Sequence, residues 1–475
     1  MSSVFNHGDL DPRAMYERPI AALPIASLCE NGYEYAMRIL HCADVHLGRR
    51  RLDGRLPETD FAVAFGHIVA RAIEWKADVL LIAGDLFDSP QIPPPVLRQA
   101  ATALEPLRKG KTLVLAIEGN HDRHLVAGTR ATWVRYLAEE GLLTLLSVPF
   151  TAEGPRLAEY DPRTLEGGLL EHQGVRFVGA GYLGAGTPRK LQALLAALPA
   201  REGPTVMLLH AGPEYFVGET GGFDRALLRE LHEKAAYLAL GHIHKPMAYG
   251  DENGRPWAIN PGSPENCRLE ESGRPGPRGW AEVELDPKAL PGLSLQRAEI
   301  RDCPRRPVLR IELDISAFGN KLKAGVEAVT AAALKALQAR KHLADATVRL
   351  FLNGELNIGR IPIEPSALGL ALAAQAGVAA VEVNTDSLKL YTGRGGGERP
   401  LLNLSTAEIE RQALEEVLKL RPPADLEDRL PEAAQLAVQL RELVARGTGP
   451  EAVLELLEQS PLPARLAEAR EKALG

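Results

Sequence analysis

The chain has 475 residues, of which 45% are hydrophobic and 25% charged, and its formal net charge at pH 7 is −7. This composition is typical of a globular protein, and at roughly 150 residues per domain the length predicts about three domains. No apolar run approaches the roughly 18 residues that a membrane span needs. The acidic balance lacks the basicity that marks many nucleic-acid binders, but it does not exclude one, because metal-holding acids count as negative only until the ions bind.

The amino-terminal segment and the cysteines indicate a cytoplasmic protein. Residues 1–36 read as a loose extension, and Met37 directly precedes a strong strand, which makes it a candidate functional start. The apolar stretch 20–28 is short and interrupted by Pro24, which argues against a secretion signal. The four cysteines are scattered without a C-x-x-C pair. This spacing is typical of free thiols in a reducing cytosol rather than of a disulfide framework or a zinc knuckle.

Short apolar runs alternate with amphipathic stretches from residue 37 to about residue 285. Helices are predicted at 61–75 and 96–107, where apolar residues recur every three or four positions. Strands that alternate with helices predict a layered α/β domain, which we place at residues 37–300. The strands are expected at 37–43, 78–83, 112–117, 175–178, 205–209, 237–240 and 280–285.

A second unit is predicted at residues 306–392, with the pattern of a small α+β split βαβ sandwich. Its expected elements are a strand at 308–313, a helix at 322–339, strands at 347–352 and 358–363, a helix at 366–374 and a strand at 378–383. The glycine-rich segment 393–397 (GRGGG) predicts a flexible break. Residues 400–475 are rich in Ala, Leu, Glu and Arg and are expected to form three or four amphipathic helices.

Five polar segments lie just past the carboxyl ends of predicted strands. In open α/β sheets the loops at this rim converge on one crevice, which is where ligand sites form. We therefore expect the five segments to meet. In chain order they are 44–46 (DVH), 84–88 (GDLFD), 119–122 (GNHD), His210 alone, and 241–244 (GHIH).

The side chains of these segments suit divalent metal ions. Aspartate oxygens together with histidine nitrogens favour manganese, iron or zinc over calcium or magnesium. Two ions about 3.5–4 Å apart can clamp a phosphate and lower the pKa of a shared water, and Asp85 is the natural carboxylate to bridge them. The candidate ligands are Asp44, His46, Asp85, Asn120, His210, His242 and His244.

Each segment also has a purely structural interpretation when it is taken alone. Asp44 could be a turn residue, Gly84 and Asp85 ordinary turn chemistry, and His210 a hydrogen-bonded core histidine. The occurrence of all five at strand ends, in this order, is what favours one shared site. Nothing in the motifs suggests a covalent serine or cysteine nucleophile.

The order D-x-H, GD-x-x-D, GNHD, H, GH-x-H resembles that of the calcineurin-like metallophosphoesterases. Four segments are similar in sequence to those of the SbcD branch, the nuclease subunits that partner an SMC-type ATPase in double-strand-break repair. These segments are MRILHCADVHLG, AGDLFD, LALGHIHKP and NPGSPE. The resemblance covers roughly residues 37–268. It implies a metallophosphoesterase sandwich of β-sheets flanked by helices, and residues 306–392 resemble the family's capping domain in pattern only.

Roles for individual residues follow from this resemblance. It implies a first metal held by Asp44, His46, Asp85 and His244, and a second held by Asp85, Asn120, His210 and His242, with manganese as the expected ion. His121 would stabilise developing charge and help to protonate the leaving 3′ oxygen, and Asp122 would orient the imidazole of His121. One departure is Ala211, because many relatives have a glycine directly beside the histidine.

The predicted substrate is DNA, and its recognition is less legible than the metal site. Arg49, Arg50 and Arg51 follow the first metal motif, and Arg123 adjoins GNHD, so these side chains either grip a DNA backbone or form a solvated basic loop. The chain lacks a P-loop motif, and the resemblance therefore implies a separate SbcC-like SMC-type ATPase and, as is common in the family, a homodimer. The helices of 400–475 either dock this ATPase or pack on their own domain, and the GRGGG break that precedes them favours docking.

Two alternatives to this nuclease remain open at the level of sequence. A phosphodiesterase or phosphatase acting on a small nucleotide would use the same metal ligands, so the metal motifs do not separate the two activities. A scaffold that has lost catalysis is disfavoured, because every expected ligand position carries a side chain that can bind a metal.

Overall fold

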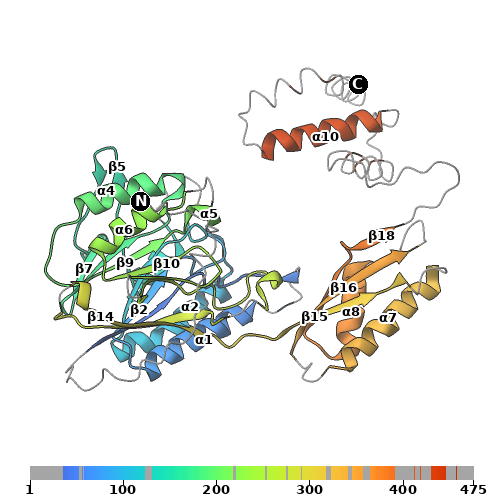
Figure 1. Ribbon diagram of the computed structural model, residues 1–475, viewed down its shortest axis with the longest axis horizontal. Helices are drawn as coiled ribbons and strands as arrows, with labels where there is room; N and C mark the ends of the chain where they lie inside the picture. Colours follow the sequence, from blue (N-terminus) through green and yellow to red (C-terminus); the bar gives the residue numbers. More distant parts are fainter. Residues whose placement is uncertain are drawn as a thin grey trace, which may run out of the picture. The chain divides into compact units, whose positions relative to one another are not determined.

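The computed structural model describes residues 36–52, 56, 58–123, 131–217, 221–251, 254–273, 276–289, 291–316, 322–340, 345–356, 364–390 and 429–445, with the single residues 411, 414, 418, 456 and 460. The chain divides into two compact units, 1–392 and 393–475, and Figure 1 shows the elements of each. Residues 1–35, the predicted strand 358–363 and the predicted break 393–397 lie outside the described residues.

The first six-stranded sheet carries three of the predicted strands at its centre. Its strands have the order β14-β13-β1-β2-β3-β4, in which β1 to β4 are parallel. At one edge, β13 is antiparallel to β1, and β14 is antiparallel to β13. Parallel strands covered on both faces read as continuous apolar runs, as the central strands do here. The strands are β1 (Met37–Cys42), β2 (Val79–Ala83), β3 (Leu113–Ile117), β4 (Thr144–Leu145), β13 (Gly279–Leu285) and β14 (Leu295–Asp302).

The second six-stranded sheet has the order β11-β12-β10-β9-β8-β7. Its four inner strands β12, β10, β9 and β8 are parallel, and both edge strands are antiparallel to their neighbours. The parallel direction places the carboxyl ends of the inner strands at one rim. The strands are β7 (Leu169–His172), β8 (Val175–Ala180), β9 (Thr205–His210), β10 (Tyr237–Gly241), β11 (Met247–Gly250) and β12 (Pro256–Asn260).

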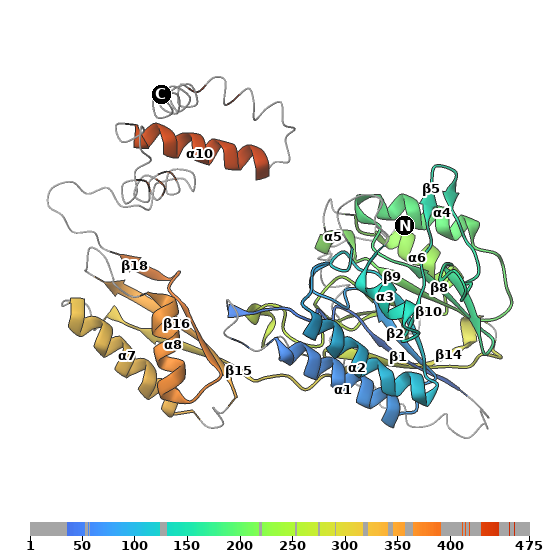
Figure 2. The ribbon, with the colours of Figure 1, turned by 180° about the vertical axis from the view of Figure 1, so that it is seen from behind.

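The two sheets pack face to face, and helices cover their outer faces (Figures 1 and 2). Side chains of both sheets, such as Leu81 and Leu208, share one buried core. The outer face of the first sheet is covered by α1 (Thr59–Glu74), α2 (Pro94–Gly110) and α3 (Trp133–Glu139), and that of the second by α4 (Thr187–Ala197) and α6 (Arg225–Lys234). This four-layered arrangement confirms the predicted α/β sandwich.

Each covering helix buries one apolar stripe. In α1 the buried residues include Phe61, Phe65 and Ile68, which recur at the three- and four-residue spacing of one helix face. Truncating a fully buried ring such as Phe65 to alanine would cost about 3–5 kcal/mol of stability. The predicted helices 61–75 and 96–107 are thus confirmed, with slightly different ends.

Residues 308–390 form a separate small α/β layer with its own core. The parallel strands β15 (Val308–Asp314), β16 (Thr347–Leu356) and β17 (Ala380–Asn384) lie side by side, and β18 (Leu388–Leu390) also pairs with β16. The helices α7 (Leu322–Gln338) and α8 (Pro365–Ala376) contribute to the same apolar cluster as the strands. The predicted strands 308–313, 347–352 and 378–383 and the predicted helices 322–339 and 366–374 are confirmed with slightly different ends, whereas β18 was not predicted.

In the second unit, α10 (Leu430–Ala445) is a described helix, at a place where the sequence predicts amphipathic helices. Throughout the described part of the chain, no helix combines the length and apolar character that a membrane span requires.

Candidate metal centre

The seven predicted ligands come from loops at neighbouring strand ends. Asp44 and His46 follow β1, Asp85 follows β2 and Asn120 follows β3, whereas His210 ends β9 and the last two histidines follow β10. The loops after β1 and β2 are tied by backbone hydrogen bonds, from Asp44 N to Gly84 O at 3.1 Å and from His46 N to Asp85 O at 3.0 Å. The structure therefore brings together the carboxyl ends of both sheets.

Four of these ligand residues have left-handed backbone conformations. The φ angles are 53° at Asp44, 51° at His46, 52° at Asp85 and 88° at His242. For a residue with a Cβ this conformation costs roughly 1–2 kcal/mol, and such strain concentrates at functional sites. Gly119 lies so close that a Cβ there would collide with the carboxylate of Asp85. The loops are thus shaped around their polar side chains at the expense of stability.

One group of ligands centres on the side-chain oxygen of Asn120. This Oδ1 lies 3.0 Å from His242 Nδ1 and 3.2 Å from His210 Nε2, and His210 Nε2 lies 3.3 Å from Asp85 Oδ2. His210 Nδ1 donates to the carbonyl of Ala83 at 2.8 Å, so in the neutral imidazole Nε2 carries a lone pair. Several acceptor atoms consequently face one another. We call this group the inner cluster: Asp85, Asn120, His210 and His242.

The other group centres on His46 and His244. Their Nε2 atoms lie 3.1 Å apart, and His46 Nε2 lies 3.8 Å from Asp85 Oδ2. His244 Nδ1 lies 3.1 Å from Glu271 Oε1, which leaves its Nε2 as an acceptor when the ring is neutral. Both Asp44 oxygens accept from the backbone N–H of His242, at 3.0 and 3.1 Å. We call this group the outer cluster and keep in it the four residues that the resemblance assigns to one ion: Asp44, His46, Asp85 and His244. The carboxylate of Asp44 also lies within 4.8 Å of ligand atoms of Asp85 and His210, so it is close to the inner cluster as well.

These contacts fit divalent metal ions. Ligand atoms about 2.0–2.2 Å from one ion lie roughly 3–3.5 Å from each other at tetrahedral or octahedral angles. The separations within the inner cluster fall in that range, and a cation relieves acceptor atoms that otherwise oppose each other. Metal-capable groups recur around Asp85, one with Asp44 and His210 and another with His46 and His121. Asp85 is therefore placed to serve two ions.

The carboxylates shift the pKa values of the histidines around them. Burial opposes a charge on His210, but the neighbouring charges of Asp85 and Asp44 raise its pKa to about 9. Burial and the charge of His210 lower the pKa of His242 to about 4. Burial disfavours the charged form of Asp85, yet His210 and His46 hold its pKa below the ordinary value. The site thus concentrates negative charge that a bound cation would neutralise in place of a proton.

The structure corrects the role expected for Asp122. Its carboxylate accepts from the backbone N–H groups of Phe87, at 3.0 Å, and Gly119, at 2.9 Å, and so ties the second loop to the third. The ring of His121 is instead oriented by the carbonyl of Asp88, which lies 2.8 Å from Nδ1. These two hydrogen bonds make Asp122 a structural link between the loops. Burial and the charge of Asp85 raise the pKa of Asp122 to about 7.

The four arginines predicted to contact substrate have different environments. Arg49 binds the carboxylate of Asp88 at 2.6 Å and the carbonyl of Cys267 at 3.0 Å. Arg50 has a side chain 70% exposed and pairs with Glu58. Arg123 donates to Glu118 and to the carbonyl of Tyr182.

Arg51 does not fit the predicted substrate role. Its side chain is only 4% exposed and is held by Asp60 and Glu265, together with the carbonyl of Asn266. The guanidinium of Arg51 is therefore an internal support of the loop that follows the first metal motif.

Several residues that support the ligands were not assigned from sequence. Asp88 lies 3.1 Å from His46 Nδ1 and receives Arg49. Asn260 donates from its amide to the carbonyls of Ile243 and Lys245, at 2.5 and 3.0 Å, and so holds the loop of the last two histidines. Only the clustering of Asp88 in the second motif, and of Asn260 in the NPGSPE segment, could have signalled these roles.

Comparison with known proteins finds similarity over the part of the chain that carries these motifs. Residues 37–246 match the family model described as calcineurin-like phosphoesterase. The DNA double-strand break repair protein Mre11 of Archaeoglobus fulgidus is 31% identical over 246 residues, which are 50% of this chain and 52% of that protein. The protein of the same name from Aeropyrum pernix is 29% identical over 293 residues, 60% of this chain and 65% of that protein.

A bacterial relative matches a similar part of the chain. The SbcD component of the nuclease SbcCD of Bacillus subtilis is 26% identical over 294 residues, which are 52% of this chain and 70% of that protein. The chain thus spans about half to two thirds of the two archaeal relatives' length. Among solved structures, a dimetal phosphatase from Danio rerio is similar over 55% of this chain and 98% of its own, with a TM-score of 0.34 at 13% identity.

Proposed function

The chain contains a calcineurin-like phosphoesterase domain, and on this premise we propose that it is a two-metal-dependent nuclease that hydrolyses the phosphodiester bonds of DNA. The observation that carries the proposal is the pair of ligand clusters that share Asp85 at the converging strand ends. The names of the curated relatives, Mre11 and the SbcD component of SbcCD, support DNA as the substrate class.

The described residues suit the chemistry of phosphodiester hydrolysis. The outer and inner clusters would each hold one divalent ion, expected to be manganese, and the ions would supply Lewis-acid activation of the phosphate and a water of lowered pKa. His121 lies beside His46, with ring centroids 4.8 Å apart. The Asp88 carbonyl accepts the Nδ1–H of His121. When the ring is protonated on both nitrogens, Nε2 carries the second proton, and in this form His121 would stabilise developing charge and give the Nε2 proton to the leaving 3′ oxygen.

The proposal extends to partners through the bacterial relative, which is named as one component of a nuclease complex. We place this chain in a similar complex with an SbcC-like SMC-type ATPase, as a homodimer in the cytoplasm. The helical region that contains α10 is the docking candidate, and residues 306–392 are the candidate capping domain. Arg50 is the exposed cation next to the first metal motif and would contact the DNA backbone.

A cleavage assay tests the activity. End-labelled linear duplex DNA is incubated with manganese and the full chain, beside p-nitrophenyl phosphate and bis-p-nitrophenyl phosphate, with His121→Ala as the control. Shortening of the DNA by the wild type but not by the variant supports the nuclease. Hydrolysis of a small ester with the DNA left intact, also in the presence of the cognate ATPase, would transfer the proposal to a phosphodiesterase or phosphatase acting on a small nucleotide.

A further inference from the structure

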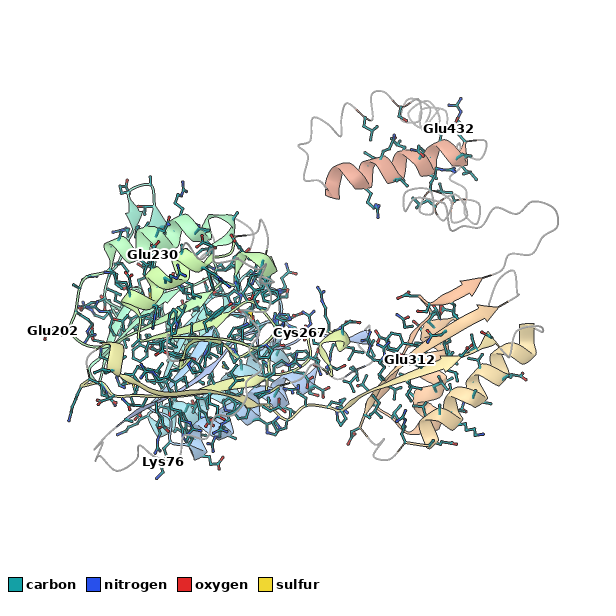
Figure 3. The ribbon with its side chains drawn as sticks, viewed as in Figure 1. Lys76, Glu202, Glu230, Cys267, Glu312 and Glu432 are labelled. Carbon is teal, nitrogen blue, oxygen red and sulfur yellow. The ribbon has the colours of Figure 1, made fainter. Side chains whose placement is uncertain are left out.

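The three consecutive side chains of the short helix η4 (Leu269–Glu271) contact two different parts of the molecule. Glu271 contacts a residue of the outer cluster, whereas Leu269 and Glu270 contact the small domain of residues 308–390. Cys267, two residues before η4, is labelled in Figure 3. One turn of chain therefore lies between a metal ligand and a second domain within the same compact unit.

Glu271 fixes the orientation of His244. Its side chain is only 7% exposed, and Oε1 lies 3.1 Å from His244 Nδ1. Oε2 accepts from the backbone N–H of Cys267 at 2.9 Å and from Arg278 Nη1 at 3.3 Å. A carboxylate held in this way keeps the proton of the imidazole on Nδ1 and directs Nε2 toward the metal position. His244 Nε2 accordingly faces His46 Nε2.

The other two residues of η4 contact the small domain. Leu269 is 4% exposed and shares a buried apolar cluster with Leu56 and with Ala380, the first residue of β17. Glu270 forms an ion pair with Arg349 on β16, and Arg349 also binds Glu382 on β17. A displacement of β16 and β17 would therefore move the backbone that carries Glu271.

We infer that Glu271 is a positioning residue for His244, and that η4 couples docking of the 308–390 domain to metal affinity in the outer cluster. The inference rests on the proposed function, because it requires that the clusters bind metal ions. Docking raises the affinity of the outer cluster and leaves the inner cluster unchanged, since the His210 ring is fixed by the Ala83 carbonyl of the sandwich. By linkage, metal binding strengthens docking by the same factor.

Calorimetric titration of manganese into the metal-free full chain tests the positioning role. His244→Ala first identifies the binding event that belongs to the outer cluster. Glu271→Ala should weaken this event by about 10–100-fold, as loss of such supporting carboxylates does, without changing the other. Glu271→Gln, which keeps an oxygen for the Nδ1–H, should lose less.

A matched control separates positioning from loss of a buried ion pair. Glu282, on β13 of the first sheet, is 2% exposed and is bound by Arg71 on α1 and by Arg301 on β14. Glu282→Ala should lower the thermal unfolding midpoint measured in chelator but leave both manganese affinities unchanged. Equal affinities in the wild type, Glu271→Ala and Glu271→Gln would overturn the positioning role.

The coupling has its own test. The double variant Leu269→Ala, Glu270→Gln removes both contacts to the small domain and keeps Glu271. It should weaken the outer event by about fivefold, the lower range of measured couplings, whereas Glu382→Gln, which breaks only the ion pair inside the small domain, should not. An unchanged outer event in the double variant overturns the coupling. A wild-type chain that binds no manganese defeats the proposed function instead.

Discussion

The inner and outer clusters share Asp85 but are held by different parts of the molecule. In the inner cluster His210 is fully buried at the end of β9, and the carbonyl of Ala83 fixes its ring. In the outer cluster the His244 side chain is 25% exposed and depends on Glu271, a residue of the peripheral turn η4. The inner cluster is thus held by the sheets themselves, whereas we infer that the geometry of the outer cluster depends on the neighbouring domain of residues 308–390.

Replacement of Asp85 should abolish metal binding in both clusters, because both share this residue. Its Oδ2 faces both His210 and His46, and its Oδ1 accepts from the backbone N–H of His121 at 2.8 Å. Asp85→Ala should therefore lose both metal ions and all cleavage. Metal content by mass spectrometry and the duplex assay measure this loss, with Asp161→Ala, which removes a partly exposed carboxylate, as the control. Retention of one tightly bound ion would refute the shared-ligand arrangement.

His121 should separate metal binding from catalysis. It lies beside the outer cluster but is assigned no metal, so His121→Ala should reduce the cleavage rate by about 10²–10⁴-fold, the usual worth of general acid–base catalysis. Both manganese affinities should stay within twofold of the wild type. His232→Ala, which removes a ring stacked on Trp257 away from the site, should leave the rate unchanged. A His121→Ala enzyme with wild-type speed would disprove the assigned role.

Single-ligand variants should reveal the unequal support of the two clusters. His242→Ala should abolish one calorimetric event and His244→Ala the other. We expect the event lost in His242→Ala to be the tighter, because the inner cluster is fixed by backbone and needs less ordering on binding. If the event lost in His244→Ala is the tighter one, the contrast between a rigid and a dependent cluster fails.

His41 lies between the two sheets and tests how they are joined. It is fully buried, with Nδ1 2.9 Å from Tyr237 Oη and Nε2 3.1 Å from the Leu240 carbonyl, so it links β1 to β10. Burial lowers its pKa to about 3 from an ordinary 6.5. Below pH 6.5 the unfolded chain takes up a proton on His41, whereas the folded protein keeps His41 neutral. The contribution of His41 to the free energy of unfolding is therefore complete above pH 6.5 and is lost as the pH falls toward 3.

The free energy of unfolding should fall by at most about 1.4 kcal/mol per pH unit through His41. Denaturant unfolding in chelator between pH 7.5 and 4.5 measures it. His41→Gln should have lower stability at pH 7.5 but a shallower decline toward acid than the wild type. An identical decline in both proteins would mean that His41 does not contribute to the acid sensitivity.

The smallest expected effect concerns the loop next to the first metal motif. Arg50→Ala should weaken duplex binding by two- to threefold and reduce the salt dependence by about one phosphate contact. Arg51→Ala, by contrast, removes the buried arginine that pairs with Glu265 and leaves Asp60 with Arg306, so it should destabilise the fold by about 3–5 kcal/mol. An unchanged salt slope in Arg50→Ala would remove this arginine from the proposed DNA contacts.

The central strands and the meeting of the motifs could be predicted because both depend on local pattern. Continuous apolar runs marked β1, β2, β3, β9 and β10, and parallel strands necessarily bring their carboxyl ends to one rim. Edge strands were missed for the opposite reason. In β14 (LQRAEIRD) half of the side chains are charged and most are only partly buried, so little in the sequence distinguishes this strand from a loop.

The errors at the site arose where a side chain's partner is far away in the sequence. Asp122 was expected to orient its neighbour His121, but its carboxylate is held by the backbone of Phe87, 35 residues earlier. Arg51 reads as part of a basic surface run until Glu265 is seen beside it, 214 residues later. Residue type and spacing indicate which chemistry is present, whereas the orientation of each group depends on contacts that only the fold creates.

The left-handed backbone at Asp44, His46, Asp85 and His242 has a consequence for protein engineering. Glycine relieves this strain, and asparagine tolerates it better than most residues. A laboratory selection for heat resistance alone would therefore accept Gly at these four positions, and Asn at His46 and His242, and would erode the candidate metal site while improving the fold. Sequence libraries for this protein should be sorted for activity and stability together, because here the two requirements favour different amino acids.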